Sequence, residues 1–76
     1  MRSMKYIVIE IQIQSDGTTG SFTWAYDSTA DAMSKYYSVL AVAVQSTVAV
    51  HTAVILDETG MVYRHECIRH EEVQDE

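Results

Sequence analysis

The strongest constraint on the fold is a strict alternation near the start of the chain. Residues 6–14 read YIVIEIQIQ, with isoleucine at every second position. Side chains of a β-strand point alternately to its two faces, so β-branched residues at a period of two predict a half-buried strand. We expect one set of these side chains to enter the core and the other to point elsewhere. The first set is Ile7, Ile9, Ile11 and Ile13, and the second is Glu10, Gln12 and Gln14.

A turn and a second strand follow. Residues 15–20 contain the dipeptide Asp16-Gly17, a strong turn signal, and a further glycine, Gly20. Three aromatic residues then alternate with small ones over residues 21–26, which is typical of a strand. Residues 4–26 therefore predict a β-hairpin, and the length of its loop leaves the register open.

Residues 29–46 lack glycine and proline and show the spacing of a helix. Ser28, with Asp31 three residues later, resembles a capping box at its start. The predicted apolar stripe is Met33, Tyr37, Leu40 and Val44, while Val42 falls on the polar side. We expect this helix to cover the isoleucine row, with Ile9 and Ile11 buried beneath Met33, Tyr37 and Leu40.

Two more strands are predicted after the helix. Residues 48–56 are apolar on both parities, which is typical of an internal strand, and residues 61–69 form the last strand. Gly60 fits the left-handed position of the turn between them. In the register that this turn favours, Ile55 faces Tyr63, Ala53 faces His65 and His51 faces Cys67.

These elements predict an α+β domain with two layers and the order ββαββ. A right-handed crossover through the helix gives an antiparallel four-stranded sheet in the order 2-1-3-4, with one helix on one face. We expect residues 4–70 to form this single domain and residues 71–76 to form an acidic C-terminal tail. Residues 1–3 are expected to be an added segment before a natural start at Met4.

Composition limits the possible functions. The formal charge is −6, which repels phosphate backbones and argues against nucleic-acid binding, whereas it would suit a basic partner. No apolar run is long enough for a membrane span, and no secretory signal is recognisable. A single cysteine fits a reducing compartment, so we expect a cytoplasmic protein.

One group of residues could support chemistry. In the predicted register His51, His65 and Cys67 share one face of the last hairpin, and imidazole and thiolate groups are good zinc ligands. Cys67 with a histidine could also act as a nucleophile and its base. The alternative is that these side chains only line the sheet. Because no spaced motif such as CxxC or HExxH is present, we expect no bound zinc and no cofactor.

Aromatic residues could also form a binding surface. Phe22, Trp24 and Tyr26 share one strand face, as in a platform on which bases or sugars stack. Basic neighbours, which nucleic-acid platforms need, are missing, so packing in a core or an interface explains them better.

The opening Met4-Lys5-Tyr6-Ile7-Val8, the Asp16-Gly17 turn and a helix entered near Asp31-Ala32 are similar to the N-terminal half of HicB-type antitoxins. The resemblance covers about half of the chain and implies paired strands before a helix and a small toxin as partner. The family's proline- and cysteine-bearing segment is absent. The whole chain also resembles short uncharacterised proteins of bacterial mobile elements and phages, which implies no activity.

The function favoured by the sequence is a protein-binding module, of the adaptor, antitoxin or inhibitor type. One helix can cover only one face of the sheet, so we expect a homodimer that covers the other. The predicted interface residues are Val50, Val54, Leu56, Val62, Tyr63 and Ile68. The alternative is a small metal- or thiol-dependent enzyme that uses His51, His65 and Cys67.

Overall fold

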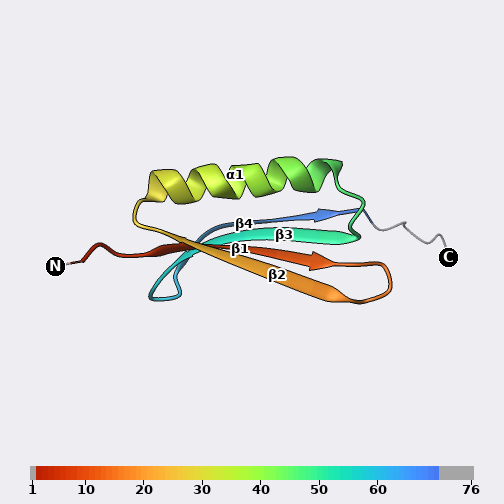
Figure 1. Ribbon diagram of the computed structural model, residues 1–76, viewed down its shortest axis with the longest axis horizontal. Helices are drawn as coiled ribbons and strands as arrows, with labels where there is room; N and C mark the ends of the chain where they lie inside the picture. Colours follow the sequence, from red (N-terminus) through yellow and green to blue (C-terminus); the bar gives the residue numbers. More distant parts are fainter. Residues whose placement is uncertain (1, 71–76) are drawn as a thin grey trace.

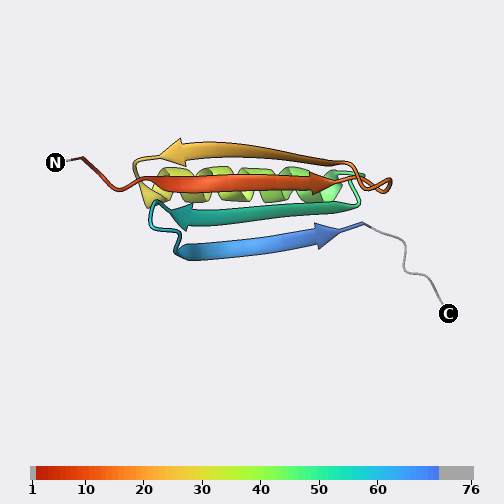
Figure 2. The same ribbon diagram turned by 90° about the horizontal axis from the view of Figure 1, so that it is seen from below.

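The computed structural model describes residues 2–70, which form a four-stranded sheet with one helix packed on one face (Figure 1). The elements are β1 (Tyr6–Ile13), β2 (Thr19–Tyr26), α1 (Thr29–Gln45), β3 (Val50–Asp57) and β4 (Val62–Arg69). Neighbouring strands are antiparallel and lie in the order β2-β1-β3-β4 (Figure 2). The predicted ββαββ fold is confirmed. The acidic tail at residues 71–76 and Met1 lie outside the described residues.

The first hairpin is regular along its whole length. Val8 lies opposite Trp24, and Glu10 lies opposite Phe22. The Gln14 N–H donates to the Thr18 carbonyl (2.8 Å), which continues the ladder into the turn. Gly17 has a φ of +91°, a left-handed conformation that favours glycine over residues with a side chain. The hairpin predicted from residues 4–26 is therefore confirmed, and its register is now fixed.

The helix begins as predicted but buries a different stripe. Ser28 is the N-cap, and its hydroxyl accepts a hydrogen bond from the Asp31 N–H (3.2 Å). The buried residues are Ala32, Tyr36, Val39 and Ala43, with Met33 and Leu40 partly buried. The prediction was wrong for Tyr37 and Val44, which are 51% and 62% exposed. Two alanines let the helix lie close to the sheet, so the buried stripe is centred on Tyr36.

The isoleucine row of β1 lies on the face away from the helix, so the prediction that it would be covered was wrong. Val8, Ala53 and Ile55 form the buried core beneath the helix. Ile9 and Ile11 are only half-buried. Figure 2 looks onto their side of the sheet, and the helix lies behind the strands.

The aromatic residues of β2 explain this choice of face. The hairpin register places Trp24 and Tyr26 on the same face as Val8, and both pack against the core. The crossover from β2 through α1 to β3 is right-handed and covers that face (Figures 1 and 2). Ser21 and Thr23 occupy the other face of β2. Covering the aromatic side chains therefore leaves the isoleucines uncovered.

The last hairpin contains a bulge that changes its register. The predicted Gly60 turn is confirmed, with a φ of +92°. Ile55 lies opposite Arg64 and His51 lies opposite Ile68, with an irregularity between Ile55 and Leu56. The predicted pairing of His51 with Cys67 was therefore wrong by one residue. A slip of one residue moves every side chain of the strand to the opposite face.

Candidate interaction surface

The uncovered side of the sheet is an apolar surface, which we call the open face. Its central strands carry large aliphatic side chains, and the bulge adds Val62 from β4. The apolar residues of the open face are Ile7, Ile9, Ile11, Ile13, Val50, Val54, Leu56 and Val62. Isolated exposed apolar residues are normal in proteins, but a contiguous patch of this kind marks an interaction site.

The rim of the open face is polar, and within residues 2–70 the edge strands project no carboxylate from it. Small or hydroxyl-bearing residues project from β2, and His65, Cys67 and Arg69 project from β4. The acidic residues of the four strands are Glu10, Asp57 and Glu66, and all three lie on the helix side of the sheet. The open face is therefore apolar in the middle and free of negative charge at both edges.

Two predicted interface residues lie elsewhere. Ile68 is opposite His51 and so belongs to the helix side of the sheet. The Tyr63 ring lies 5.7 Å from the ring of Tyr6, and its hydroxyl donates to Asp57 Oδ2 (2.9 Å). The register error accounts for Ile68, whereas the predicted register had already set Tyr63 opposite Ile55, on the side that the helix covers. Val50, Val54, Leu56 and Val62 do lie on the open face.

The structure separates the predicted group of His51, His65 and Cys67. His51 faces the helix and is 1% exposed, whereas His65 and Cys67 are exposed on the open face. Within residues 2–70 no group of three or more His, Cys, Asp or Glu side chains is placed to hold a metal ion. The structure therefore does not bring the three predicted residues together, although His65 and Cys67 share the open face.

His51 instead pairs with Glu10 under the helix. The imidazole Nε2 and the carboxylate Oε2 are in hydrogen-bond contact, and Gln12 Nε2 donates to the same oxygen (3.0 Å). Glu10 is 9% exposed, and His51 Nδ1 has no hydrogen-bond partner among the described residues. The sequence analysis missed this pair because it placed Glu10 on the side away from the core. The available signal was a glutamate and a histidine, each within an apolar run that forms a central strand.

A polar network closes the end of the sheet at which the chain enters. Asp57 is buried at the end of β3, and its Oδ1 accepts hydrogen bonds from the N–H groups of Thr59 (2.8 Å) and Met61 (3.2 Å). Chiefly through the Thr59 hydroxyl, these bonds lower the pKa of Asp57 to about 2. The bond from Tyr63 to Asp57 raises the pKa of the tyrosine. The carboxylate thus organises the turn between β3 and β4.

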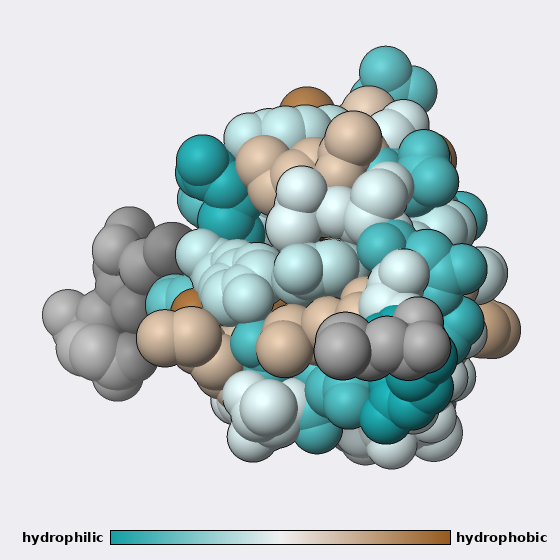
Figure 3. Space-filling view, turned by 90° about the vertical axis from the view of Figure 1, so that its left-hand side faces the viewer, coloured by the Kyte–Doolittle hydropathy of each residue, from teal (hydrophilic) through white to brown (hydrophobic). Residues whose placement is uncertain are grey.

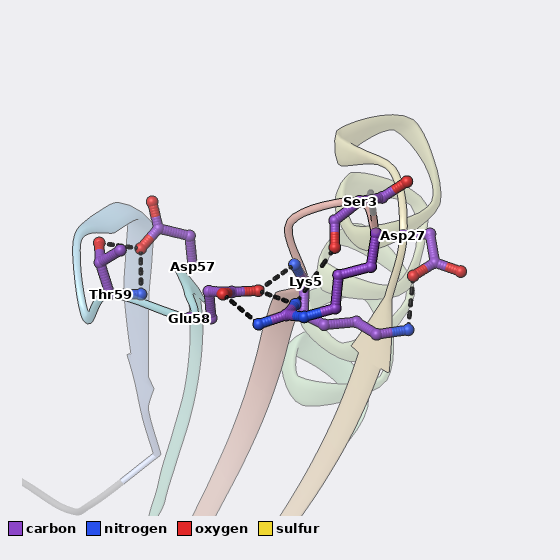
Figure 4. Close-up of polar contacts among 7 residues, drawn as sticks. Ser3, Lys5, Asp27, Asp57, Glu58 and Thr59 are labelled. Carbon is purple, nitrogen blue, oxygen red and sulfur yellow. Dashed lines mark hydrogen bonds and ion pairs between the residues drawn. The ribbon is translucent and has the colours of Figure 1, made fainter.

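Glu58 ties the N-terminal segment to the same turn (Figure 4). It forms a two-bond contact with the Arg2 guanidinium (2.8 and 2.9 Å) and accepts the Lys5 N–H (2.8 Å). The hydrogen bond from Arg2 is the main reason that the pKa of Glu58 falls to about 2. Lys5 Nζ also pairs with Asp27 (2.5 Å). Hydrophilic and hydrophobic side chains are mixed at this end of the molecule (Figure 3).

A shallow, open hollow lies on the other side of the molecule, between α1 and β2. Its lining is largely polar and consists of Tyr26, Asp31, Ser34, Lys35 and Ser38. Lys35 Nζ lies 4.0 Å from the centre of the Trp24 ring, which is a cation–π contact. Two residues of the predicted aromatic platform, Trp24 and Tyr26, therefore pack against the core, whereas Phe22 is 52% exposed.

Comparisons with known proteins give no match to a family model, a curated protein or a solved structure. No helix within residues 2–70 has the length and apolar character needed to cross a membrane.

Proposed function

We propose that this protein is a small protein-binding module that acts as a homodimer through its open face. The observation that carries the proposal is the row of aliphatic side chains left uncovered on β1 and β3. Each Å² of apolar surface left in water forgoes about 25 cal/mol of stabilisation. This loss is large for a domain whose whole stability is about 5–15 kcal/mol. A second protein surface would remove that cost.

A second copy fits the open face in size. Four strands about 4.8 Å apart, with eight residues each at about 3.3 Å, span roughly 500 Å². Two such faces together bury about 1,000 Å², the lower limit for a specific interface. Stacked sheets pack face to face in this manner in β-sandwiches.

A second copy also fits in charge. Although the chain has a net charge of −6, the acidic residues of its four strands lie on the helix side and not on the open face. A two-fold axis parallel to the strands sets β1 against β3 of the partner, and β2 against β4. Arg69 then meets the hydroxyl-bearing edge of β2 and not another arginine. Like charges are therefore kept apart in the dimer.

The proposal places the dimer in the cytoplasm, as an adaptor, antitoxin or inhibitor. The resemblance of residues 4–32 to HicB-type antitoxins supports a partner protein as the ligand. An origin in a mobile element would agree with that role. The fold offers a rigid scaffold for such a partner, since β1 and β3 are paired on both sides.

Light scattering across a dilution series tests the dimer. We expect a particle of about twice the 8.6 kDa chain mass at micromolar concentration. Ile9→Lys puts a charge in the middle of the open face and should give a folded monomer. Val42→Lys is the matched control, because Val42 is 60% exposed on the helix and should leave the dimer intact. A wild-type monomer, or an Ile9→Lys variant that stays dimeric, would refute the proposal.

A further inference from the structure

The two edges of the sheet differ in their protection. An edge strand exposes unpaired backbone groups and is usually guarded by charges, proline or bulges. β4 carries Arg64, Glu66 and Arg69 and contains the bulge. β2 has eight residues, TGSFTWAY, without a charge or a proline, and it pairs regularly with β1. The edge at β2 is therefore long, regular and unguarded.

The register shows which backbone groups of β2 point outward. The Gln14 N–H donates to Thr18 O, and backbone bonds alternate in direction along an antiparallel strand. The even-numbered residues of β2 thus bond to β1, and the odd-numbered ones point away from the sheet. The outward set is Thr19, Ser21, Thr23 and Ala25. Their side chains are small and uncharged, so a further strand could approach closely.

The side chains beside this edge favour a particular kind of ligand. Phe22 is half-exposed and stacks near Trp24, with ring centres 6.2 Å apart. Apolar side chains of an added strand would pack on these rings. Asp16 lies in the loop before β2, where Thr18 binds its carboxylate. A basic residue at that end of the added strand would meet its charge, in keeping with the net charge of −6.

We propose that β2 binds an extended segment of a partner protein as a fifth strand. The segment has an uncharged centre, with apolar side chains toward Phe22 and Trp24, and a lysine or arginine beside Asp16. Main-chain bonds to Ser21, Thr23 and Ala25 supply the affinity, and the alternating side chains supply the specificity. The inference rests on the proposed function, because it names the partner chemistry of the binding module. It leaves the open face to the second copy.

The probe is a phage-displayed library of random ten-residue peptides, selected against the wild-type protein. We expect enrichment of strand-forming peptides with an apolar centre and a basic residue near one end. Thr23→Pro should weaken binding of the synthesised winners at least tenfold, because it removes an outward N–H without touching the ladder to β1.

The matched control is Cys67→Pro on the guarded edge. The His70 N–H donates to Ala49 O, so by the same alternation the Cys67 N–H points outward from β4. This variant should bind the peptides as the wild type does. Circular dichroism and thermal midpoints show whether both variants remain folded.

Hydrogen exchange on the wild-type protein tests the same inference without a variant. Adding a selected peptide should slow the exchange of the Ser21, Thr23 and Ala25 amides and leave that of Cys67 unchanged. No enrichment, equal binding by Thr23→Pro, or unchanged β2 amides would each overturn the inference. So would β2 amides already protected without peptide, since a second copy would then occupy the edge.

Failure of this inference is distinct from failure of the proposed function. A dimer that enriches no peptide overturns the fifth strand and leaves the homodimer standing. A monomer that binds peptides through Thr23 overturns the homodimer and supports the fifth strand.

Discussion

The two faces of the sheet reverse the usual relation between burial and polarity. On the covered face lie the buried ionisable residues that the structure describes, Glu10, His51 and Asp57. The open face contains the most regular apolar pattern of the chain and remains half-exposed. An apolar row therefore shows that a surface needs cover, but it does not identify the element that covers it. Here the helix covers the aromatic face, and the isoleucines remain uncovered.

Loss of His51 should have the largest effect, because it breaks a buried pair on the covered face. We expect His51→Ala to lower the free energy of unfolding by about 3–5 kcal/mol, since Glu10 is left buried without its imidazole partner. Urea unfolding measures the change. The control is the double variant Glu10→Leu with His51→Leu, which removes both partners and should be far milder. If the single and double variants are equally unstable, the pair is not what makes the covered face sensitive.

Ile55→Ala should have the next largest effect on stability, because Ile55 is 1% exposed in the core beneath the helix. Removal of a buried aliphatic side chain costs about 2–5 kcal/mol, enough to unfold much of a small domain. The thermal midpoint and circular dichroism measure the loss. An unchanged midpoint would contradict the assignment of the odd-numbered side of β3 to the core.

The sequence predicts the features that adjacent residues determine better than those that depend on residues far apart in the chain. The cap at Ser28 and the turn at Gly60 are set by adjacent residues, and both were predicted. Which face of the sheet the helix covers depends on residues from two hairpins. The prediction of that face was wrong because the sequence left the pairing of Val8 with Trp24 undetermined. An aromatic strand without charges was the signal for the covered face.

The predicted group of His51, His65 and Cys67 does not form, for a similar reason. One extra residue at the bulge turned His65 and Cys67 to the face opposite His51. Local sequence patterns do not reveal the bulge, because the predicted and the observed register of the β3–β4 hairpin both place the Gly60 turn between the same two strands. Four of the six residues predicted for the interface, Val50, Val54, Leu56 and Val62, lie on β3 or at the bulge and share the open face, whereas Ile68 and Tyr63 do not.

Acid should weaken the covered side of the molecule through Asp57. Its pKa is lowered from 3.8 to about 2 in the folded protein, and that of Glu58 from 4.5 to about 2. Each carboxylate therefore adds stability that is complete above its ordinary pKa and is lost as the pH falls toward 2. We expect the urea midpoint to fall between about pH 4.5 and pH 2.

Asp57→Asn is the control for this acid effect. It should have a lower midpoint at pH 7 and a smaller further loss in acid, because one of the carboxylates with a lowered pKa is gone. A variant with the full acid dependence of the wild type would show that the turn at Asp57 does not contribute to it.

Ile9→Ala should have the smallest effect in dilute solution and so gives the finest test of the comparison. Ile9 is only half-buried in a single chain, so removing three carbon groups should cost roughly 1 kcal/mol, less than the same change at Ile55. The loss should grow with protein concentration, because the proposed dimer would gain stability by mass action and the variant would gain less. Thermal midpoints of both proteins at several concentrations measure this growth. A loss that is large and independent of concentration would mean that the isoleucine row belongs to the core of the single chain after all.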